Sequence, residues 1–254
     1  MRARSARCHR SRPGRAAGVT LVELAVVLSI VGLLGVVVGT GLGDVARMGD
    51  AANAHADAER ARQAVRAFAL RHQRLPCPDL SAFGDGAREG LAGNCPAGAQ
   101  VGWLPYESLG LARPDREQRL RYAVSRAGAA DLVVPGAAGA ALEGGTPLRA
   151  ALAAAARQAR GTNRPYLTGP GTGASPEDCA LVQSNPAFVL VAPARDADGV
   201  GLTHPGFDGV NAAMAGAGQL CIAAPSRPAD ARYDDVVVAE GASALLGWLA
   251  AQTR

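Results

Sequence analysis

The chain has 254 residues, with 26 basic side chains that are all arginine, 22 acidic ones and a net charge of +4. Six of the arginines lie in residues 1–18, which contain no acid, so residues 19–254 carry 20 basic and 22 acidic side chains, a net of −2. Because the positive charge belongs to this short N-terminal stretch, the composition argues against a nucleic-acid-binding protein, and we expect no nucleic-acid partner.

Residues 19–42 form an apolar run in which Glu23 is the single charge. Such a run is long enough to span a bilayer as a helix, which needs about 20 residues. The arginines before it predict a cytoplasmic N-terminus. A carboxylate at the centre of a membrane helix costs roughly 2.5–3.5 kcal/mol on insertion scales. The position of Glu23 therefore predicts a charged partner.

Two ordinary explanations of the apolar run leave Glu23 unexplained. A secretory signal peptide has a shorter apolar region of about 7–15 residues before its cleavage site, although residues 52–54, Ala-Asn-Ala, imitate such a site. An uncleaved signal anchor accommodates the length of the run but has no need of a glutamate.

The stretch from Gly18 to Glu23, GVTLVE, is followed at once by an apolar helix pattern. It resembles the N-terminal signature of type IV pilins and type II secretion pseudopilins. The resemblance implies that a prepilin peptidase cuts after Gly18, that Val19 becomes the methylated N-terminus, and that Glu23 is the fifth residue of the mature chain. Two features differ from the commonest members: Val19 stands where phenylalanine is commoner, and the leader, which ends only at Gly18, is long.

The physical chemistry of these residues agrees with the resemblance. Val19 and Glu23 are four positions apart in the sequence, so they share one face of a helix. A cut after Gly18 creates a cationic amine beside the carboxylate of Glu23, from the same subunit or from a neighbour. Their pairing offsets much of the cost of burying either charge. We therefore expect Glu23 to set the register of assembly.

The helical period continues beyond the apolar run, through residues 43–74. Apolar side chains recur there at three- and four-residue steps, and arginines and acids fill the other faces. The recurring residues are Val45, Met48, Ala51, Ala58, Ala61, Val65 and Phe68. The prolines in residues 75–79, LPCPD, end the pattern. A helix that is continuous from about Leu21 to Leu70 would be roughly 75 Å long, half in a membrane or filament core and half behind a soluble domain.

Four of the five cysteines, Cys77, Cys95, Cys179 and Cys221, follow the apolar run, whereas Cys8 lies in the leader. An even number outside the apolar run favours disulfides and an oxidising compartment. Their wide spacings contain no C-x-x-C pair of the kind found in zinc sites. Four cysteines allow three pairings, and we predict Cys77–Cys95 with Cys179–Cys221 because this pairing closes the shortest loops.

Residues 75–111 contain LPCPD, a glycine-rich loop and GWLPYESLGL, and are similar to a block in pilin-like proteins of Gram-negative bacteria. The prolines and glycines form a loop that cannot build its own core, so a Cys77–Cys95 bridge would hold it. We interpret Trp103 and Tyr106 as packing residues.

Past residue 111 the sequence alternates between short strand-like runs, helical patterns and glycine- and proline-rich loops. The strand-like runs are 120–125, 131–134, 187–192, 219–223 and 233–239. The helical patterns are 148–160 and 243–251, and the loops are 136–147 and 161–178. The pattern predicts an α+β, pilin-like fold, in which a long N-terminal helix with a membrane-spanning first half packs on an antiparallel β-sheet.

The sequence predicts neither an enzyme nor a cofactor. The motifs G-x-S-x-G and H-E-x-x-H are absent. The four histidines are scattered, and we interpret each as a surface residue. They are His9, His55, His72 and His204.

Two acidic pairs are weak candidates for binding a cation. Asp196 and Asp198, followed by Gly199, imitate the start of a calcium loop, but the closing glutamate is missing. We interpret them as a solvated turn and predict no metal site. Asp234 and Asp235, before an apolar run, are interpreted first as a strand-entry turn and only second as cation ligands.

Together these features predict a prepilin-like structural subunit with four segments. They are a basic leader (1–18), a transmembrane or filament-core helix (19–42), its amphipathic continuation (43–74) and a disulfide-stapled periplasmic domain (75–254). We expect a single-pass inner-membrane protein that joins a type IV pilus or type II secretion pseudopilus as a minor subunit. Its expected partners are prepilin peptidase, other pilin or pseudopilin subunits, an inner-membrane assembly platform and membrane lipid. The alternative is a signal-anchored periplasmic binding module without filament assembly, and an anchored hydrolase is the least favoured class.

Overall fold

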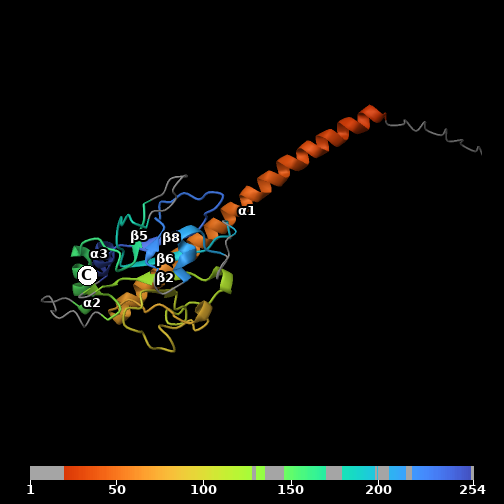
Figure 1. Cartoon of the computed structure of the whole chain (residues 1–254). Helices are drawn as coiled ribbons and strands as arrows, with labels where there is room; N and C mark the ends of the chain where they lie inside the picture. The colour runs from red at the N-terminus through yellow and green to blue at the C-terminus, as the bar shows by residue number, and fades with distance from the viewer. Residues whose placement is uncertain are drawn as a thin grey trace, which may run out of the picture. The chain divides into compact units, whose positions relative to one another are not determined.

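The computed structural model of the chain describes residues 20–127, 130–134, 146–169, 179–197, 199, 206–215 and 219–252, without the side chains of residues 34–47. The chain divides into two compact units, Met1–Arg47 and Met48–Arg254. The second unit contains the described β-strands, the two shorter α-helices and both disulfides (Figure 1).

Helix α1 spans Leu21–His72. Thr20 caps its first turn, because Thr20 Oγ1 accepts the Glu23 N–H at 3.3 Å and the Thr20 carbonyl accepts the Leu24 N–H at 3.1 Å. The helix ends ahead of the predicted stop at residues 75–79, and Gln73 directly after it takes a positive φ of 52°. The prolines of that stretch cannot continue a helix.

The prediction of a membrane-spanning first half is wrong for the part of the chain that the structure describes. No helix there has an apolar stretch long enough to cross a bilayer. The apolar side chains described at the start of α1 belong to residues 21–33, which cover about 20 Å at about 1.5 Å per residue. The hydrocarbon core of a bilayer is about 30 Å thick. This finding corrects both the predicted fold class and the predicted location as a single-pass inner-membrane protein, and it leaves an α+β architecture with an antiparallel sheet.

The second unit is built around a four-stranded antiparallel sheet in the order β1-β2-β6-β8. The strands are β1 (Val101–Trp103), β2 (Arg121–Val124), β6 (Phe188–Ala192) and β8 (Val236–Glu240). The central strands β2 and β6 are buried at every residue. Because both faces of β6 are covered, its sequence FVLVA is apolar throughout and does not alternate with polar residues.

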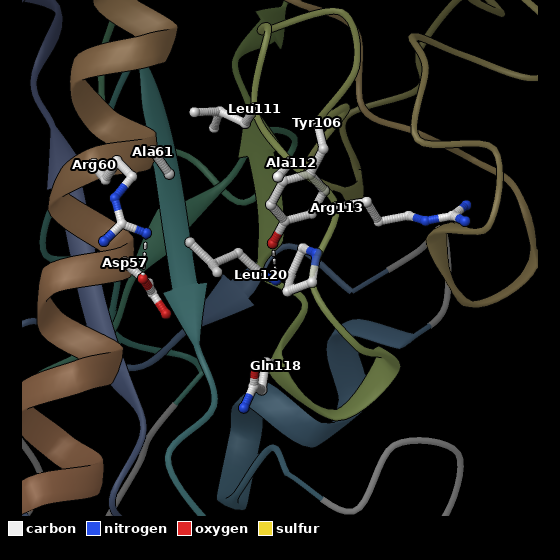
Figure 2. A pocket seen from close by; sticks show the side chains of 10 residues that line it. Asp57, Arg60, Ala61, Tyr106, Leu111, Ala112, Arg113, Gln118 and Leu120 are labelled. Carbon is white, nitrogen blue, oxygen red and sulfur yellow. Dashed lines mark hydrogen bonds and ion pairs between the residues drawn. The ribbon is translucent and has the colours of Figure 1, made fainter.

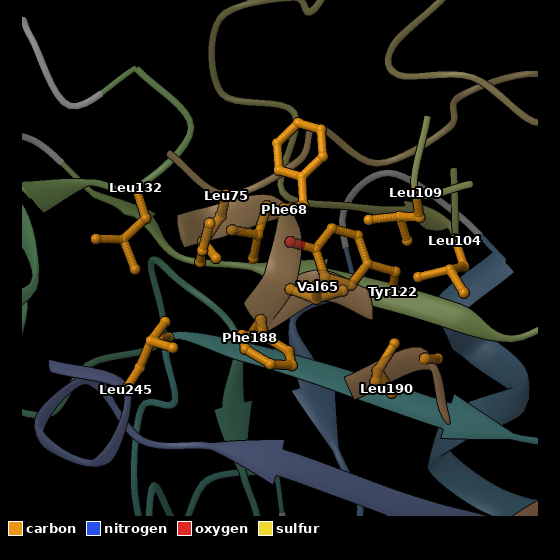
Figure 3. Close-up of a cluster of buried hydrophobic side chains, with 14 of the residues drawn as sticks. Val65, Phe68, Leu75, Leu104, Leu109, Tyr122, Leu132, Phe188, Leu190 and Leu245 are labelled. Atoms are coloured by element: carbon orange, nitrogen blue, oxygen red, sulfur yellow. The ribbon is translucent and has the colours of Figure 1, made fainter. Parts of the chain in front are cut away.

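One face of the sheet packs against the part of α1 that lies in the second unit. Side chains two positions apart on a strand point to the same face, and Tyr122, Phe188 and Leu190 form one buried cluster with Val65 and Phe68 of α1 (Figure 3). The predicted apolar positions 58, 61, 65 and 68 are buried, position 51 is half-buried, position 48 is exposed, and the side chain at 45 lies outside the described residues. The helical period therefore identified the core face of α1 from residue 58 onward.

The opposite face of the sheet carries a second buried cluster. Val189 and Val191 of β6 lie in it together with Phe207, Met214 and Tyr233. Met214 belongs to the 3-10 helix η4 (Gly209–Ala215), and Tyr233 precedes β8. The sheet is thus a middle layer with an apolar core on each side.

Two short helices complete the first core. Helix α2 (Pro147–Arg157) starts with proline at its first position, where no amide hydrogen is needed. Helix α3 (Ala242–Ala251) follows β8 directly. The two helices contact each other, and Arg149 Nη2 of α2 donates to the Leu249 carbonyl of α3 at 2.9 Å.

Glu240, the last residue of β8, is an acid inside the first core. It is 2% exposed, and Arg66 Nη2 of α1 donates to its Oε1 at 2.9 Å and to its Oε2 at 2.8 Å. Arg62 Nη1 lies 3.7 Å from Glu240 Oε2. These ion pairs tie α1 to the edge strand of the sheet.

The remaining strands are short. β3 (Arg126–Ala127) pairs antiparallel with β4 (Ala130–Asp131), and β5 (Tyr166–Leu167) pairs parallel with β7 (Cys221–Ile222). Two single-turn 3-10 helices, η1 (Ala82–Gly84) and η2 (Arg116–Gln118), lie in the loops before β1 and β2.

Both predicted disulfides are confirmed. Cys77 is bonded to Cys95, and Cys179 is bonded to Cys221. Cys8 lies outside the described residues.

Some predicted elements differ from the structure. Of the predicted strand 131–134 only Asp131, in β4, is a strand residue, because the Asp131 carboxylate accepts the N–H groups of Val133 and Val134 at 2.8 and 3.0 Å and bends the chain there. The predicted loop 161–178 contains β5 in its described part, and its residues 170–178 lie outside the described residues, as do residues 136–145 of the other predicted loop. Helix α2 ends at Arg157, whereas the helical pattern extends to residue 160.

Candidate functional site

Residues 21–33, here called the apolar segment, present an apolar surface on every face of α1. The large apolar side chains in this segment are between 51% and 85% exposed. They are Leu21, Val22, Leu24, Val26, Val27, Leu28, Ile30, Val31 and Leu33. A helix that is apolar on all sides normally lies buried among other elements, and contiguous exposed apolar surface marks a site of interaction. The apolar segment is therefore the first candidate for a functional surface.

Glu23 is the single charge of the apolar segment and lies in the first turn of α1, exposed. A carboxylate in that position is favoured by the helix dipole. Among the described residues, no basic side chain lies within 4.0 Å of it. Gly18 and Val19, predicted as the processing site, lie outside the described residues. In the described part of the chain, Glu23 is thus an exposed carboxylate without an ion-pair partner.

An open groove runs beside α1 in the second unit. Its two adjoining hollows, of about 390 and 330 Å³, share Asp57, Arg60, Gln118 and Leu120. Asp57 Oδ1 and Arg60 Nη1 pair with each other at 2.7 Å, while Arg113 points away from them (Figure 2). The groove is thus a shallow surface whose acid and base on α1 already neutralise each other.

The two aromatic residues predicted to pack do so. Tyr106 is 5% exposed, and its hydroxyl oxygen accepts the Leu120 N–H at 2.9 Å (Figure 2). Burial raises the pKa of Tyr106 above its ordinary value. Trp103 is 4% exposed, and the Arg121 guanidinium stacks 3.6 Å from the ring centroid. Burial lowers the pKa of Arg121 to about 10.

Three carboxylates meet next to the second core. Oxygen atoms of Asp208, Asp234 and Asp235 lie within 4.8 Å of one another. The sequence predicts a cation-binding role for Asp234 and Asp235 only as a second interpretation, and it does not indicate Asp208. A single acid before a glycine gives no periodic or spacing signal, so only the fold could reveal that Asp208 joins this group.

The other predicted candidates do not join this group. Asp196 is exposed, and its Oδ1 accepts the Gly199 N–H at 2.8 Å, which is the hydrogen bond of an ordinary turn. Asp198 lies outside the described residues, as do His9 and His204. His55 and His72 are exposed on α1, as predicted.

Comparison with known proteins does not assign the chain to a family: no protein-family model, no curated protein and no solved structure matches it. The functional interpretation therefore depends on the residues themselves. Of the surfaces described, the apolar segment is the one whose chemistry is least compatible with permanent contact with water.

Proposed function

We propose that this chain is a structural subunit of a type IV pilus or type II secretion pseudopilus, made as a precursor and cut by prepilin peptidase after Gly18. One observation carries the proposal. The exposed apolar segment begins directly after the prepilin-type residues 18–20 and contains Glu23 as its single charge. An interaction surface of this kind needs partners, and the motif before it favours partners that are filament subunits.

The distribution of apolar side chains favours several partners over one. A helix that docks against a single surface needs an apolar stripe on one face only, whereas the exposed apolar side chains of the apolar segment surround the helix. Covering them contributes on the order of 10 kcal/mol before the entropy of association is subtracted. We infer that the segments of several subunits bundle together at the centre of a filament.

Glu23 is the specificity element of this bundle. In an apolar bundle an unpaired carboxylate is strongly unfavourable, because its lost hydration is not replaced. The amine of Val19, created by the cut after Gly18, is the matching charge and can belong to the same or to a neighbouring subunit. Only a register that brings amine and carboxylate together is then stable.

The first experiment tests processing. Purified from cells that contain prepilin peptidase, the chain should have the intact mass of a polypeptide that runs from methylated Val19 to Arg254. The variant Gly18→Arg should keep residues 1–18, whereas Gly14→Arg, at another leader glycine, should be cut normally. An intact leader in the unchanged protein, or a different start, would overturn the proposal.

The second experiment tests assembly. Glu23→Gln keeps the size of the side chain and removes its charge, so it should reduce incorporation into sheared filaments while the mature mass still shows the cut after Gly18. Asp57→Asn, a matched change at an exposed acid of α1 that pairs with Arg60, should assemble normally. Equal incorporation of Glu23→Gln and the unchanged protein would show that the charge does not direct assembly.

We also propose that the subunit is a minor one. Residues 136–147 and 161–178 are rich in glycine and proline, a composition that favours loops, and loops carry recognition more often than regular packing. Quantitative proteomics of sheared filaments should find this chain at a small fraction of the main subunit. If it proves to be the most abundant subunit, the minor role is wrong while the filament role stands.

A further inference from the structure

The three carboxylates of Asp208, Asp234 and Asp235 form a compact group in the second unit. Their oxygen atoms lie within 4.8 Å of one another. Asp208 lies just before η4, and the other two lie just before β8. Asp208 is fully buried and Asp235 is 7% exposed, so two of the three charges are withdrawn from water.

Hydrogen bonds hold the group in place. Asp208 Oδ1 accepts the Ala197 N–H at 2.9 Å, and Asp208 Oδ2 accepts the Asp234 N–H at 3.0 Å. Asp235 Oδ2 accepts the Asp208 N–H at 3.1 Å and the Asn211 Nδ2–H at 2.9 Å. Because these bonds run between different segments, the group joins three parts of the chain and leaves Asp208 and Asp235 little freedom to move apart.

The buried side chain of Asn211 helps to hold Asp235 in place. Its Nδ2 also lies 3.1 Å from the Tyr233 hydroxyl, and its Oδ1 accepts the Ala223 N–H at 3.1 Å. With both ends of its amide engaged, Asn211 fixes the side of Asp235 that faces the core. The carboxylate is thus oriented by its surroundings before any ligand arrives.

One oxygen of the group has no partner. Asp235 Oδ1 is buried, and among the described residues no hydrogen-bond donor reaches it. No basic side chain in the described part of the chain lies within 4.0 Å of Asp235, whereas Asp234 Oδ2 has Arg195 Nε at 3.7 Å. A buried acceptor in this position calls for a cationic ligand.

We propose that Asp208, Asp234 and Asp235 bind a divalent cation, for which Ca²⁺ is the best match. Carboxylate oxygens are hard ligands that Ca²⁺ and Mg²⁺ prefer over softer metals. Two oxygens bound to one Ca²⁺ at about 2.3–2.6 Å lie at most about 5 Å apart, so the three carboxylates are close enough to share one ion. Mg²⁺ requires a near-ideal octahedron, which carboxylates already fixed by backbone hydrogen bonds are poorly able to supply.

The bound ion would act as a structural clamp on the second core. It would join the loop at Ala197, the start of η4 and the entry to β8 around Phe207 and Tyr233, both of which are buried in that core. The site is therefore independent of the apolar segment and of Glu23, and it concerns the stability of the second unit.

The test uses the purified full chain after treatment with a chelator. Isothermal titration calorimetry with CaCl₂ should give one ion per chain, and about 1 mM Ca²⁺ should raise the Tm measured by calorimetry, with a smaller response to Mg²⁺. Asp235→Asn supplies an amide in place of the unpartnered oxygen. This variant should fold with a Tm no lower than that of the ion-free protein, bind Ca²⁺ at least about tenfold more weakly, and lose the Tm response.

Two matched variants act as controls. Asp230→Asn removes an exposed acid that lies near Asp235 in the sequence, and Asp196→Asn removes the exposed acid of the neighbouring turn. Both should keep the Ca²⁺ affinity and the Tm response. The proposal is overturned if the unchanged protein shows neither binding heat nor a Tm response, or if Asp196→Asn weakens binding as much as Asp235→Asn does. Equal responses to Mg²⁺ and Ca²⁺ would overturn the assignment to Ca²⁺.

Discussion

The ion pair of Arg66 and Glu240 couples α1 to the sheet. Glu240 is 2% exposed and accepts two hydrogen bonds from Arg66 Nη2. Glu240→Ala would leave Arg66 beside an apolar core without its acid, whereas Arg62 keeps an ion pair with Glu59 at 2.7 Å. Removing one partner of a fully buried pair costs roughly 3–5 kcal/mol. We expect about 2–3 kcal/mol here, because Arg66 keeps 20% of its side chain exposed and can be hydrated.

Urea unfolding of the full chain measures this effect. The matched control is Asp57→Ala, which breaks the exposed pair with Arg60 on the same helix and should change the free energy of unfolding by less than about 0.5 kcal/mol. If the two variants lower the free energy of unfolding equally, burial does not increase the contribution of the Glu240 pair to stability.

Two glycines give opposite predictions for the same substitution. A Cβ at Gly102 would lie 2.5 Å from the Asp79 carbonyl oxygen, where residues 78–79 run against β1. A Cβ at Gly247 would meet nothing within 4 Å on helix α3. We expect Gly102→Ala to lower the free energy of unfolding by about 1–3 kcal/mol through overpacking. Gly247→Ala should raise it by roughly 0.5–1 kcal/mol through helix propensity. A stabilising Gly102→Ala would contradict the close approach.

Mutation can separate the role of the apolar segment of α1 from the role of the sheet. Leu28 of the apolar segment is 63% exposed, whereas Leu190 of β6 is fully buried. Leu190→Ala should cost about 2–5 kcal/mol of unfolding free energy. Leu28→Ala should cost well under about 1 kcal/mol yet weaken self-association, measured by sedimentation velocity. A large loss of stability from Leu28→Ala would show that the apolar segment serves folding instead of assembly.

Several elements could be predicted from sequence because their signals are local. Strand β6 reads as a continuous apolar run, and α3 follows a glycine and an acid with a clear helical pattern. Strand β1 could not be predicted, since its sequence Val-Gly-Trp lies inside a stretch of prolines and glycines, and it forms through pairing with β2 and, at Trp103, with Asp79. Strand β5 is very short and depends on β7, which lies far along the chain.

Some features of the candidate sites could likewise be predicted from the sequence, whereas others could not. The Cys77–Cys95 and Cys179–Cys221 pairing followed from loop lengths, and the apolar segment followed from hydropathy. The predicted membrane-spanning helix was wrong, as described above. Asp208 joins Asp234 and Asp235 only because η4 folds against the entry to β8, and no spacing rule in the sequence encodes that contact.

The second unit is a sheet between two cores, and each core has its own disulfide. Cys77 is buried in the first core with Leu75 and Phe68, and Cys221 leads into Ile222 of the second core. Most of the described polypeptide between the strands is irregular, so the order of these loops depends on cross-links that hold them at particular points. The disulfides are two such cross-links, and the proposed cation would be a third.

The two disulfides close loops of different length. In the chain-entropy model a bridge stabilises by restricting the unfolded chain, so the sequence separation of 18 between Cys77 and Cys95 contributes about 3 kcal/mol and the separation of 42 between Cys179 and Cys221 about 4 kcal/mol. We therefore expect the double variant Cys179→Ala with Cys221→Ala to lose slightly more unfolding free energy in urea than Cys77→Ala with Cys95→Ala. Cys8→Ala, which removes the fifth cysteine, should lose none. If either double variant unfolds at the same urea concentration as the unchanged protein, that bridge does not constrain the unfolded chain, and the loops it closes are held by packing alone.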